Sequence, residues 1–334
     1  MDETRFGLRE LPFRPMPNVD CYYPATTHEQ ASAQILEAIE ADEGLALLIG
    51  EPGTGKTTLC LRLLQQVGEQ HTRAFITHGH FATSKDLLQA VLYDIGLGYQ
   101  DRSEEELRLL LTDLAIKNYE AGKRTILFFD EAQHLTCYLL EELRLITNLD
   151  GNRGKAIQVV LAAQPSVMET LRRPELAALN QRLAVRARLE PLGVHEASDY
   201  LAHHLRAAST PNRAILTDEA MALLARGTHG VPRLLNRAAR RALELAAMSE
   251  ANEVDAEAAM EALAVLGLGD TDGGDAEPDG ELNLADKDGE NGEAIETTPP
   301  GWEQTAKKES AAGSDIAKEV SRARRLFAPP RRPA

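Results

Sequence analysis

Short apolar runs alternate with longer amphipathic segments over the first two thirds of this chain. The apolar runs are LALLI at 45–49, AFIT at 74–77, TILFF at 125–129 and QVVLAA at 158–163. Uninterrupted apolar runs of this length are typical of buried parallel strands. Between them, apolar residues recur three and four positions apart, as in Leu139, Leu143, Ile146 and Leu149, which predicts helices that cover a sheet. The pattern predicts an α/β fold with a doubly wound parallel sheet.

The pattern changes after residue 193, where strand signals stop. Helical periodicity continues at about 195–207, 217–227, 232–247 and 255–264, which predicts a small all-helical lid. We therefore divide the chain into an N-terminal segment, an α/β domain, a helical lid and a disordered tail, at 1–27, 28–192, 193–266 and 267–334.

Charge is concentrated in the tail. The chain carries a net charge of -16, but residues 270–303 alone hold twelve acidic residues and one basic residue, so the rest is only mildly acidic. Such a Gly-, Asp- and Glu-rich stretch predicts disorder. The chain then ends in a basic cluster around Arg324, Arg325, Leu326 and Phe327. This end is suited to docking on a partner or an anionic surface, or serves only to keep the chain soluble.

Composition also indicates the compartment. Three separated cysteines without CxxC spacing disfavour a zinc site or a disulfide framework. No run approaches the roughly 20 apolar residues of a membrane span, and the N-terminus lacks the apolar core of a signal peptide. We expect a cytoplasmic protein.

Residues 50–57, GEPGTGKT, match the P-loop motif in full, between a predicted strand and a predicted helix. Glycines in this loop let successive N–H groups point at phosphate oxygens, reinforced by the helix N-terminus. Lys56 is expected to reach the β- and γ-phosphates of ATP, and the Thr57 hydroxyl to bind Mg²⁺. The predicted nucleotide-binding residues are Gly50, Glu51, Pro52, Gly53, Thr54, Gly55, Lys56, Thr57, Thr58 and Asp130.

Two carboxylates follow the apolar run at 125–129. Asp130 is expected to join Thr57 in holding Mg²⁺, and Glu131 to orient a water for in-line attack on the γ-phosphate. Taken alone, a strand that ends in Asp-Glu is as often a strand meeting a polar loop. Paired with an upstream P-loop, it predicts ATP hydrolysis.

Several motifs in order resemble the AAA+ ATPases, and more closely those of the ExeA or general secretion pathway protein A type. The resemblance covers roughly residues 5–264. It rests on FGLRELPF at the N-terminus, the P-loop, Asp130 to Gln133, AQP at 163–165, Gln181-Arg182 and GVPRLLN at 230–236. It implies a P-loop NTPase fold with a helical lid, binding of ATP and Mg²⁺, and hydrolysis of ATP.

The resemblance also implies roles for three polar residues. Gln164 would be the sensor near the γ-phosphate, Arg233 a second sensor on the lid, and Arg182 an arginine finger acting in a neighbouring subunit. Simpler alternatives remain for each of them: a strand-end turn, a solvated arginine at a helix start, and a surface ion pair. Other arginines stand close to the finger position, namely Arg172, Arg173, Arg186 and Arg188.

Five other positions carry less specific signals. Pro12, Phe13 and His28 are candidates for the adenine pocket or plain packing residues, and Glu142 is expected on a solvated helix face next to Glu141. The histidines show no spacing typical of metal ligands.

Three functions fit these features. The first is an ATPase, homo-oligomeric when it binds ATP, that assembles or remodels a protein partner in an envelope machine such as a secretion or pilus system. The second is a DNA-associated regulator of the transposition or replication type, although the sequence gives no specific support for binding of nucleic acid and we find no winged-helix segment after the lid. The third is a nucleotide-gated scaffold with little turnover. Full-length secretion-type relatives continue into a membrane span and a peptidoglycan-binding region, neither of which we find here.

Overall fold

The computed structural model describes residues 6–150, 154–209 and 215–268. Contacts along the backbone divide the chain into residues 1–273 and 274–334. The second of these segments lies outside the described residues, as do the predicted acidic tail beyond Leu268 and its basic end. In the part of the chain that the structure describes, no helix is both long and apolar enough to cross a membrane.

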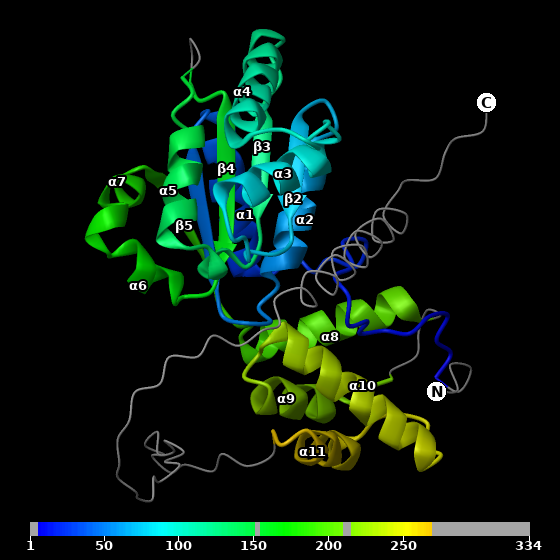
Figure 1. Cartoon of the computed structure of the whole chain (residues 1–334). Coiled ribbons are helices and arrows are strands. Elements are labelled where there is room, and N and C mark those ends of the chain that lie inside the picture. Colours follow the sequence, from blue (N-terminus) through cyan, green and yellow to red (C-terminus); the bar gives the residue numbers. More distant parts are fainter. Residues whose placement is uncertain (1–5, 151–153, 210–214, 269–334) are drawn as a thin grey trace, which may run out of the picture. The chain divides into compact units, whose positions relative to one another are not determined.

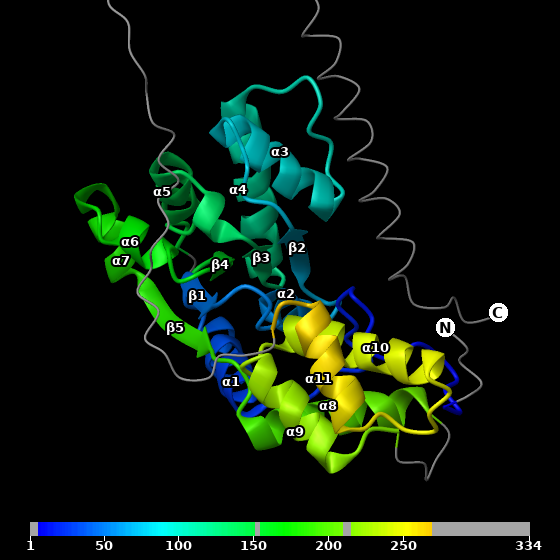
Figure 2. The ribbon, with the colours of Figure 1, turned by 90° about the horizontal axis from the view of Figure 1, so that it is seen from below.

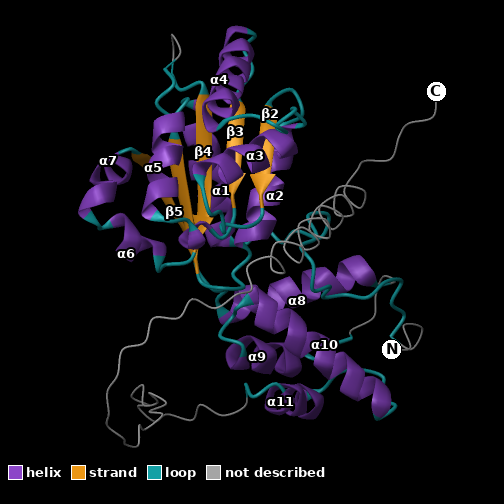
Figure 3. Ribbon diagram, viewed as in Figure 1, coloured by secondary structure: helices purple, strands orange, loops and turns teal. Residues whose placement is uncertain are grey.

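A parallel sheet of five strands lies at the centre of the N-terminal part, in the order β2-β3-β4-β1-β5. Figure 3 draws its strands in orange. The strands are β1 (Leu45–Gly50), β2 (Thr72–Ile76), β3 (Thr125–Phe129), β4 (Ile157–Ala163) and β5 (Leu183–Leu189). All four pairings are parallel. The predicted α/β fold with a parallel sheet is therefore confirmed.

The fifth strand corrects the four-strand prediction. β5 pairs with β1 at the edge of the sheet, and buried Leu183, Ala187 and Leu189 alternate with exposed residues that include Arg186 and Arg188. The sequence analysis looked for uninterrupted apolar runs, which fit β1, β3 and β4 because every residue in these strands is buried. An edge strand with one solvated side shows period-two alternation instead.

Helices cover both faces of the sheet (Figures 1 and 2). Side chains of β1 point alternately to each face, so that Leu47 packs with one set of helices and Leu48 with the other. One face carries α1 (Thr26–Glu40) and α2 (Lys56–Val67); the other carries α3 (Ser84–Ile95), α4 (Glu104–Glu120) and α5 (Cys137–Ile146). Short helical turns, η1 (Ala132–His134), α6 (Val167–Leu171), η2 (Pro174–Leu176) and α7 (Ala177–Gln181), complete this part.

Four helices follow the sheet, where the lid was predicted. They are α8 (Val194–Ala208), α9 (Asp218–Gly227), α10 (Pro232–Met248) and α11 (Ala256–Val265). They share a separate hydrophobic cluster, which also includes Phe6, Leu8 and Phe13 from the N-terminal segment. The start of the chain therefore packs on the lid helices.

Glu142 is buried, which corrects its expected place on a solvated face. Its side chain is 4% exposed and lies 2.8 Å from the Arg108 guanidinium of α4. Burial raises the pKa of this carboxyl, and the charge of Arg108 opposes that shift. The pair joins α4 to α5. Periodicity did not reveal it, because a buried carboxylate needs a partner from another helix.

The connection from the sheet to the lid passes through a tight backbone contact. Leu192 N–H donates to the Gly230 carbonyl at 2.9 Å, and Gly230 has φ +65. A Cβ at Gly230 would lie 1.8 Å from the Leu192 carbonyl oxygen. Only glycine fits this position without moving one backbone segment away from the other.

We expect Gly230→Ala to lower the free energy of unfolding by more than about 1 kcal/mol, because it adds both a positive-φ penalty and a backbone clash. Chemical denaturation monitored by circular dichroism measures this. Gly98→Ala is the matched control, since a Cβ there meets open space, and it should change stability by less than about 0.5 kcal/mol. Equal stability of the two variants would contradict the assigned role of Gly230.

Candidate functional site

The P-loop connects β1 to α2 and its conformation depends on glycine. Gly53 and Gly55 have φ of +86 and +100, and a Cβ at Gly50 would lie 2.6 Å from the Thr54 hydroxyl. Gly55 directly precedes α2, which begins at Lys56. The loop therefore ends at the N-terminus of a twelve-residue helix, where free N–H groups and the helix dipole favour an anion.

Lys56 is buried beneath this loop. Its ammonium donates to the carbonyls of Gly50 at 2.8 Å and Glu51 at 3.1 Å. Burial lowers the pKa of Lys56, while the charges of Glu131 and Asp130 raise it. The Lys56 ammonium thus contacts backbone carbonyl oxygens that phosphate oxygens can replace as hydrogen-bond acceptors.

The sequence motif after β3 lies against the start of α2. The Thr57 hydroxyl donates to Asp130 Oδ2 at 2.5 Å, and Asp130 Oδ1 accepts from the backbone N–H of Glu131 at 2.9 Å. Burial raises the pKa of Asp130, and these two hydrogen bonds oppose that shift. A hydroxyl and a carboxylate next to a phosphate-binding loop are the hard oxygen donors that suit Mg²⁺. The residues present therefore fit this ion.

Glu131 and Gln164 also come together, from the ends of β3 and β4. The Gln164 side-chain amide lies 3.4 Å from Glu131 Oε2. The two strands are neighbours and parallel, so their carboxyl ends share one edge of the sheet. This contact joins the predicted catalytic acid to the predicted sensor.

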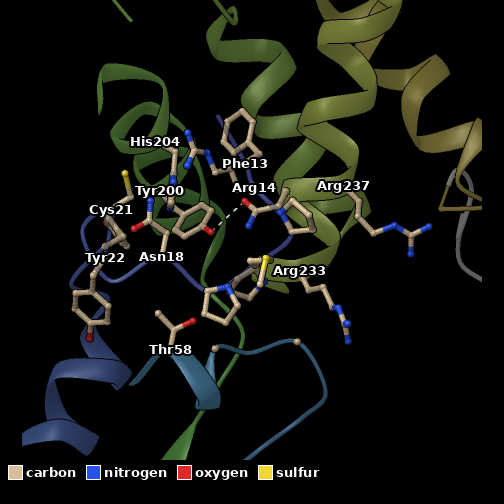
Figure 4. A pocket seen from close by; sticks show the side chains of 18 of the residues that line it. Phe13, Arg14, Asn18, Cys21, Tyr22, Thr58, Tyr200, His204, Arg233 and Arg237 are labelled. Atoms are coloured by element: carbon tan, nitrogen blue, oxygen red, sulfur yellow. Dashed lines mark hydrogen bonds between the residues drawn. The ribbon is translucent and has the colours of Figure 1, made fainter. Parts of the chain in front are cut away.

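A cavity of about 960 Å³ lies beside the P-loop (Figure 4). Its lining comes from the N-terminal segment, the P-loop, α8 and α10, and includes Glu131 and Thr57. Tyr200 on α8 donates to Asn236 on α10 at 3.0 Å, and the Tyr200 ring lies 4.3 Å from that of His204. Burial lowers the pKa of His204 to about 4, so its ring is uncharged at neutral pH. An apolar and aromatic wall beside a phosphate loop suits a nucleotide base.

Pro12, Phe13 and His28 all line this cavity, as the sequence suggested. His28 has a more specific contact as well. Its Nε2 lies 2.8 Å from the Thr54 carbonyl, in a buried setting, and a Cβ on Gly55 would lie 3.0 Å from the same nitrogen. Because a carbonyl only accepts, Nε2 carries the proton and donates. His28 thus supports the backbone of the P-loop.

The predicted arginines lie in different places. Arg233 lines the cavity, and its backbone N–H donates to the Gly53 carbonyl at 3.2 Å. Arg237, one helical turn further along α10, also lines the cavity and projects to the same side (Figure 4). Sequence reasoning missed Arg237, although its i+4 spacing from Arg233 was a usable signal. Arg182 is exposed and is absent from the described lining, so the structure does not bring it to this site.

The described residues contain no group of three or more His, Cys, Asp or Glu side chains able to hold a metal ion. His80 and His134 stack with ring centroids 4.5 Å apart, but no third ligand joins them. A metal site at the P-loop therefore needs phosphate oxygens as further ligands.

Comparisons with known proteins agree with this geometry. A family model described as AAA domain matches residues 39–171. General secretion pathway protein A of Aeromonas hydrophila is 39% identical over 239 residues, which cover 71% of this chain and 43% of that protein. The chain therefore matches less than half the length of this curated relative.

Solved structures support the fold. The Aeropyrum pernix ORC2 protein, in complexes with ADPNP and ADP, aligns with a TM-score of 0.58 and 14% identity, over 79% of this chain and 71% of that one. Cdc6p from Pyrobaculum aerophilum aligns with a TM-score of 0.57 and 17% identity, over 78% and 70%. The sheet, P-loop and helical lid are thus similar to those of these proteins. Together with the match to the AAA domain model, they confirm the expected P-loop NTPase fold.

We expect His28→Phe to weaken binding of ADP by about tenfold, because it leaves the buried Thr54 carbonyl without a donor and loosens the P-loop. Titration with a fluorescent ADP analogue measures the affinity. His28→Gln keeps a donor and should bind within about twofold of the wild type. Equal affinities of the Phe and Gln variants would show that the hydrogen bond does not support the loop.

Proposed function

We propose that this chain, an AAA-type P-loop ATPase, couples magnesium-dependent hydrolysis of ATP to the remodelling of a partner complex in the cell envelope. The observation that carries this proposal is the contact between α10 and the P-loop, in which Arg233 N–H donates to the Gly53 carbonyl. Gly53 belongs to the loop that cradles phosphates, so phosphate binding and release act directly on the start of a lid helix.

Each residue of the site has a role in this reaction. Lys56 exchanges its carbonyl acceptors for β- and γ-phosphate oxygens, and Thr57 and Asp130 would hold Mg²⁺, which would neutralise phosphate charge. Glu131 orients the attacking water, and Gln164 contacts the γ-phosphate from the end of β4. Arg233 and Arg237 approach from the lid.

Arg182 acts, we propose, on the nucleotide of a neighbouring copy in a homo-oligomer. Its exposure and its absence from the lining of its own cavity support a role in trans. A guanidinium that arrives from a neighbour stabilises charge in the transition state and makes turnover depend on assembly.

The envelope role rests on the 39% identity to general secretion pathway protein A. Because the chain matches 43% of that protein, its partner and its place in such a machine are proposals. The cytoplasmic location expected from composition is likewise a proposal.

A second candidate, a DNA-associated ATPase, is favoured by one observation. Five arginines between α6 and the end of β5 are exposed: Arg172, Arg173, Arg182, Arg186 and Arg188. Exposed guanidinium groups bind DNA phosphates as well as a neighbour's nucleotide. Binding of duplex DNA that weakens steeply with salt would favour this candidate over a purely protein partner.

We expect Glu131→Gln to lower ATP turnover by at least about 100-fold and to leave ATP binding intact, because the amide no longer accepts a proton from water.

Turnover per subunit, measured against protein concentration together with light scattering, tests the reaction and the trans mechanism at once. In the wild type it should rise as oligomers form, and Arg182→Ala should abolish that rise. Flat, negligible wild-type turnover with tight ATP binding would point to a nucleotide-gated scaffold.

We expect Asp130→Asn to remove most of the effect of Mg²⁺ on nucleotide affinity, because the carboxylate that would hold the ion becomes a neutral amide. Titrations of ATP with Mg²⁺ and with a chelator, in the wild type and the variant, give this effect. The wild type should bind ATP more tightly with Mg²⁺. An unchanged Mg²⁺ effect in Asp130→Asn would rule out Asp130 as a residue that holds the ion.

A further inference from the structure

Gln133 links the predicted catalytic acid to the predicted sensor strand. It lies in η1, two residues after Glu131 and outside the residues assigned to the site from the sequence. Its side-chain Nε2 donates to Glu131 Oε2, and its Oε1 accepts from the backbone N–H of Gln164 at 3.0 Å. One amide thus contacts the ends of both β3 and β4.

The orientation of this amide follows from its partners. The backbone N–H of Gln164 only donates, so the oxygen of Gln133 must face it. The amide nitrogen must then face Glu131, which as a carboxylate only accepts. Both ends of the side chain are therefore matched, and a flipped amide would lose both hydrogen bonds.

This arrangement leaves the two oxygens of Glu131 in different situations. Oε2 accepts a hydrogen bond from the Gln133 amide nitrogen and lies 3.4 Å from the amide nitrogen of Gln164. Among the described residues, Oε1 has no hydrogen-bond partner. A carboxylate fixed through one oxygen presents the other in a defined direction, as a group that orients water must do.

The backbone of Glu131 is also constrained. It has φ 52 and ψ 38, an uncommon left-handed conformation for a residue with a side chain. A Cβ on Gly79, in the loop after β2, would lie 2.7 Å from the Glu131 carbonyl oxygen. The main chain is thus confined from one side while Gln133 holds the side chain from the other.

We propose that Gln133 is a positioning residue that fixes the Glu131 carboxylate and holds it in register with the end of β4. The contact of Gln133 to β4 is made to main chain, so it persists when the Gln164 side chain turns to a phosphate. Glu131 then keeps one amide donor throughout the reaction. This inference rests on ATP hydrolysis at this site and is independent of the partner that hydrolysis drives.

The test is Gln133→Met, which keeps the size of the side chain and removes both hydrogen bonds. We expect kcat for ATP to fall about 10- to 100-fold with KM changed by less than about twofold, because Glu131 loses its orientation while the P-loop is untouched. In a Glu131→Gln background, Gln133→Met should have no further effect, since it acts through Glu131. Gln100→Met, at an exposed loop glutamine, is the matched control and should keep wild-type kcat.

Two results would overturn the proposal: a kcat of Gln133→Met close to that of the wild type, or a further loss in the Glu131→Gln background. Wild-type turnover in the same assay separates such a failure from a failure of the ATPase function itself.

Discussion

The site depends on parallel strands that end at one edge of the sheet. The P-loop follows β1, the Asp130-Glu131 pair follows β3, and Gln164 follows β4, which lies between the other two. The hydrogen bond from the Thr57 hydroxyl to Asp130 joins the first turn of α2 to the end of β3. A change of register in any of these strands would move one of the groups by a residue and turn its side chain to the other face. The extensive burial of β1, β3 and β4 prevents such a shift.

Much of this arrangement was predictable because it rests on local rules. The P-loop was recognised from its motif and from the strand and helix that flank it, and the lid helices from periodicity. Features set by contacts between distant segments were missed. β5 alternates arginine with apolar residues and pairs with β1. Glu142 is buried only because Arg108 reaches it from another helix. Gln133 accepts a hydrogen bond from the backbone N–H of Gln164, at the end of the neighbouring strand. The spacing of residues within one segment does not reveal which residues of other segments they contact.

Charge at the site is balanced between burial and attraction. Burial lowers the pKa of Lys56 and raises that of Asp130, and the two groups partly offset these shifts for each other. Each charged group also has hydrogen bonds within the protein: carbonyls for Lys56, and a hydroxyl and an N–H for Asp130. The site is thus preorganised, and a nucleotide replaces existing partners with its own oxygens instead of creating order anew.

Close backbone contacts connect the lid helices to the P-loop. Two glycines permit backbone segments to touch: Gly53 in the P-loop meets Arg233, and Gly230 before α10 meets Leu192. At both points a Cβ would force the segments apart, by contact with the Arg233 side chain in one case and a carbonyl oxygen in the other. Between these two contacts lie only Val231 and Pro232, and the proline begins α10 with a fixed φ. Because this connection is short and held at both ends, we expect a shift of the P-loop to move the start of α10. Side chains alone, which turn about several bonds, would transmit such a shift less faithfully than main chain held between two close contacts.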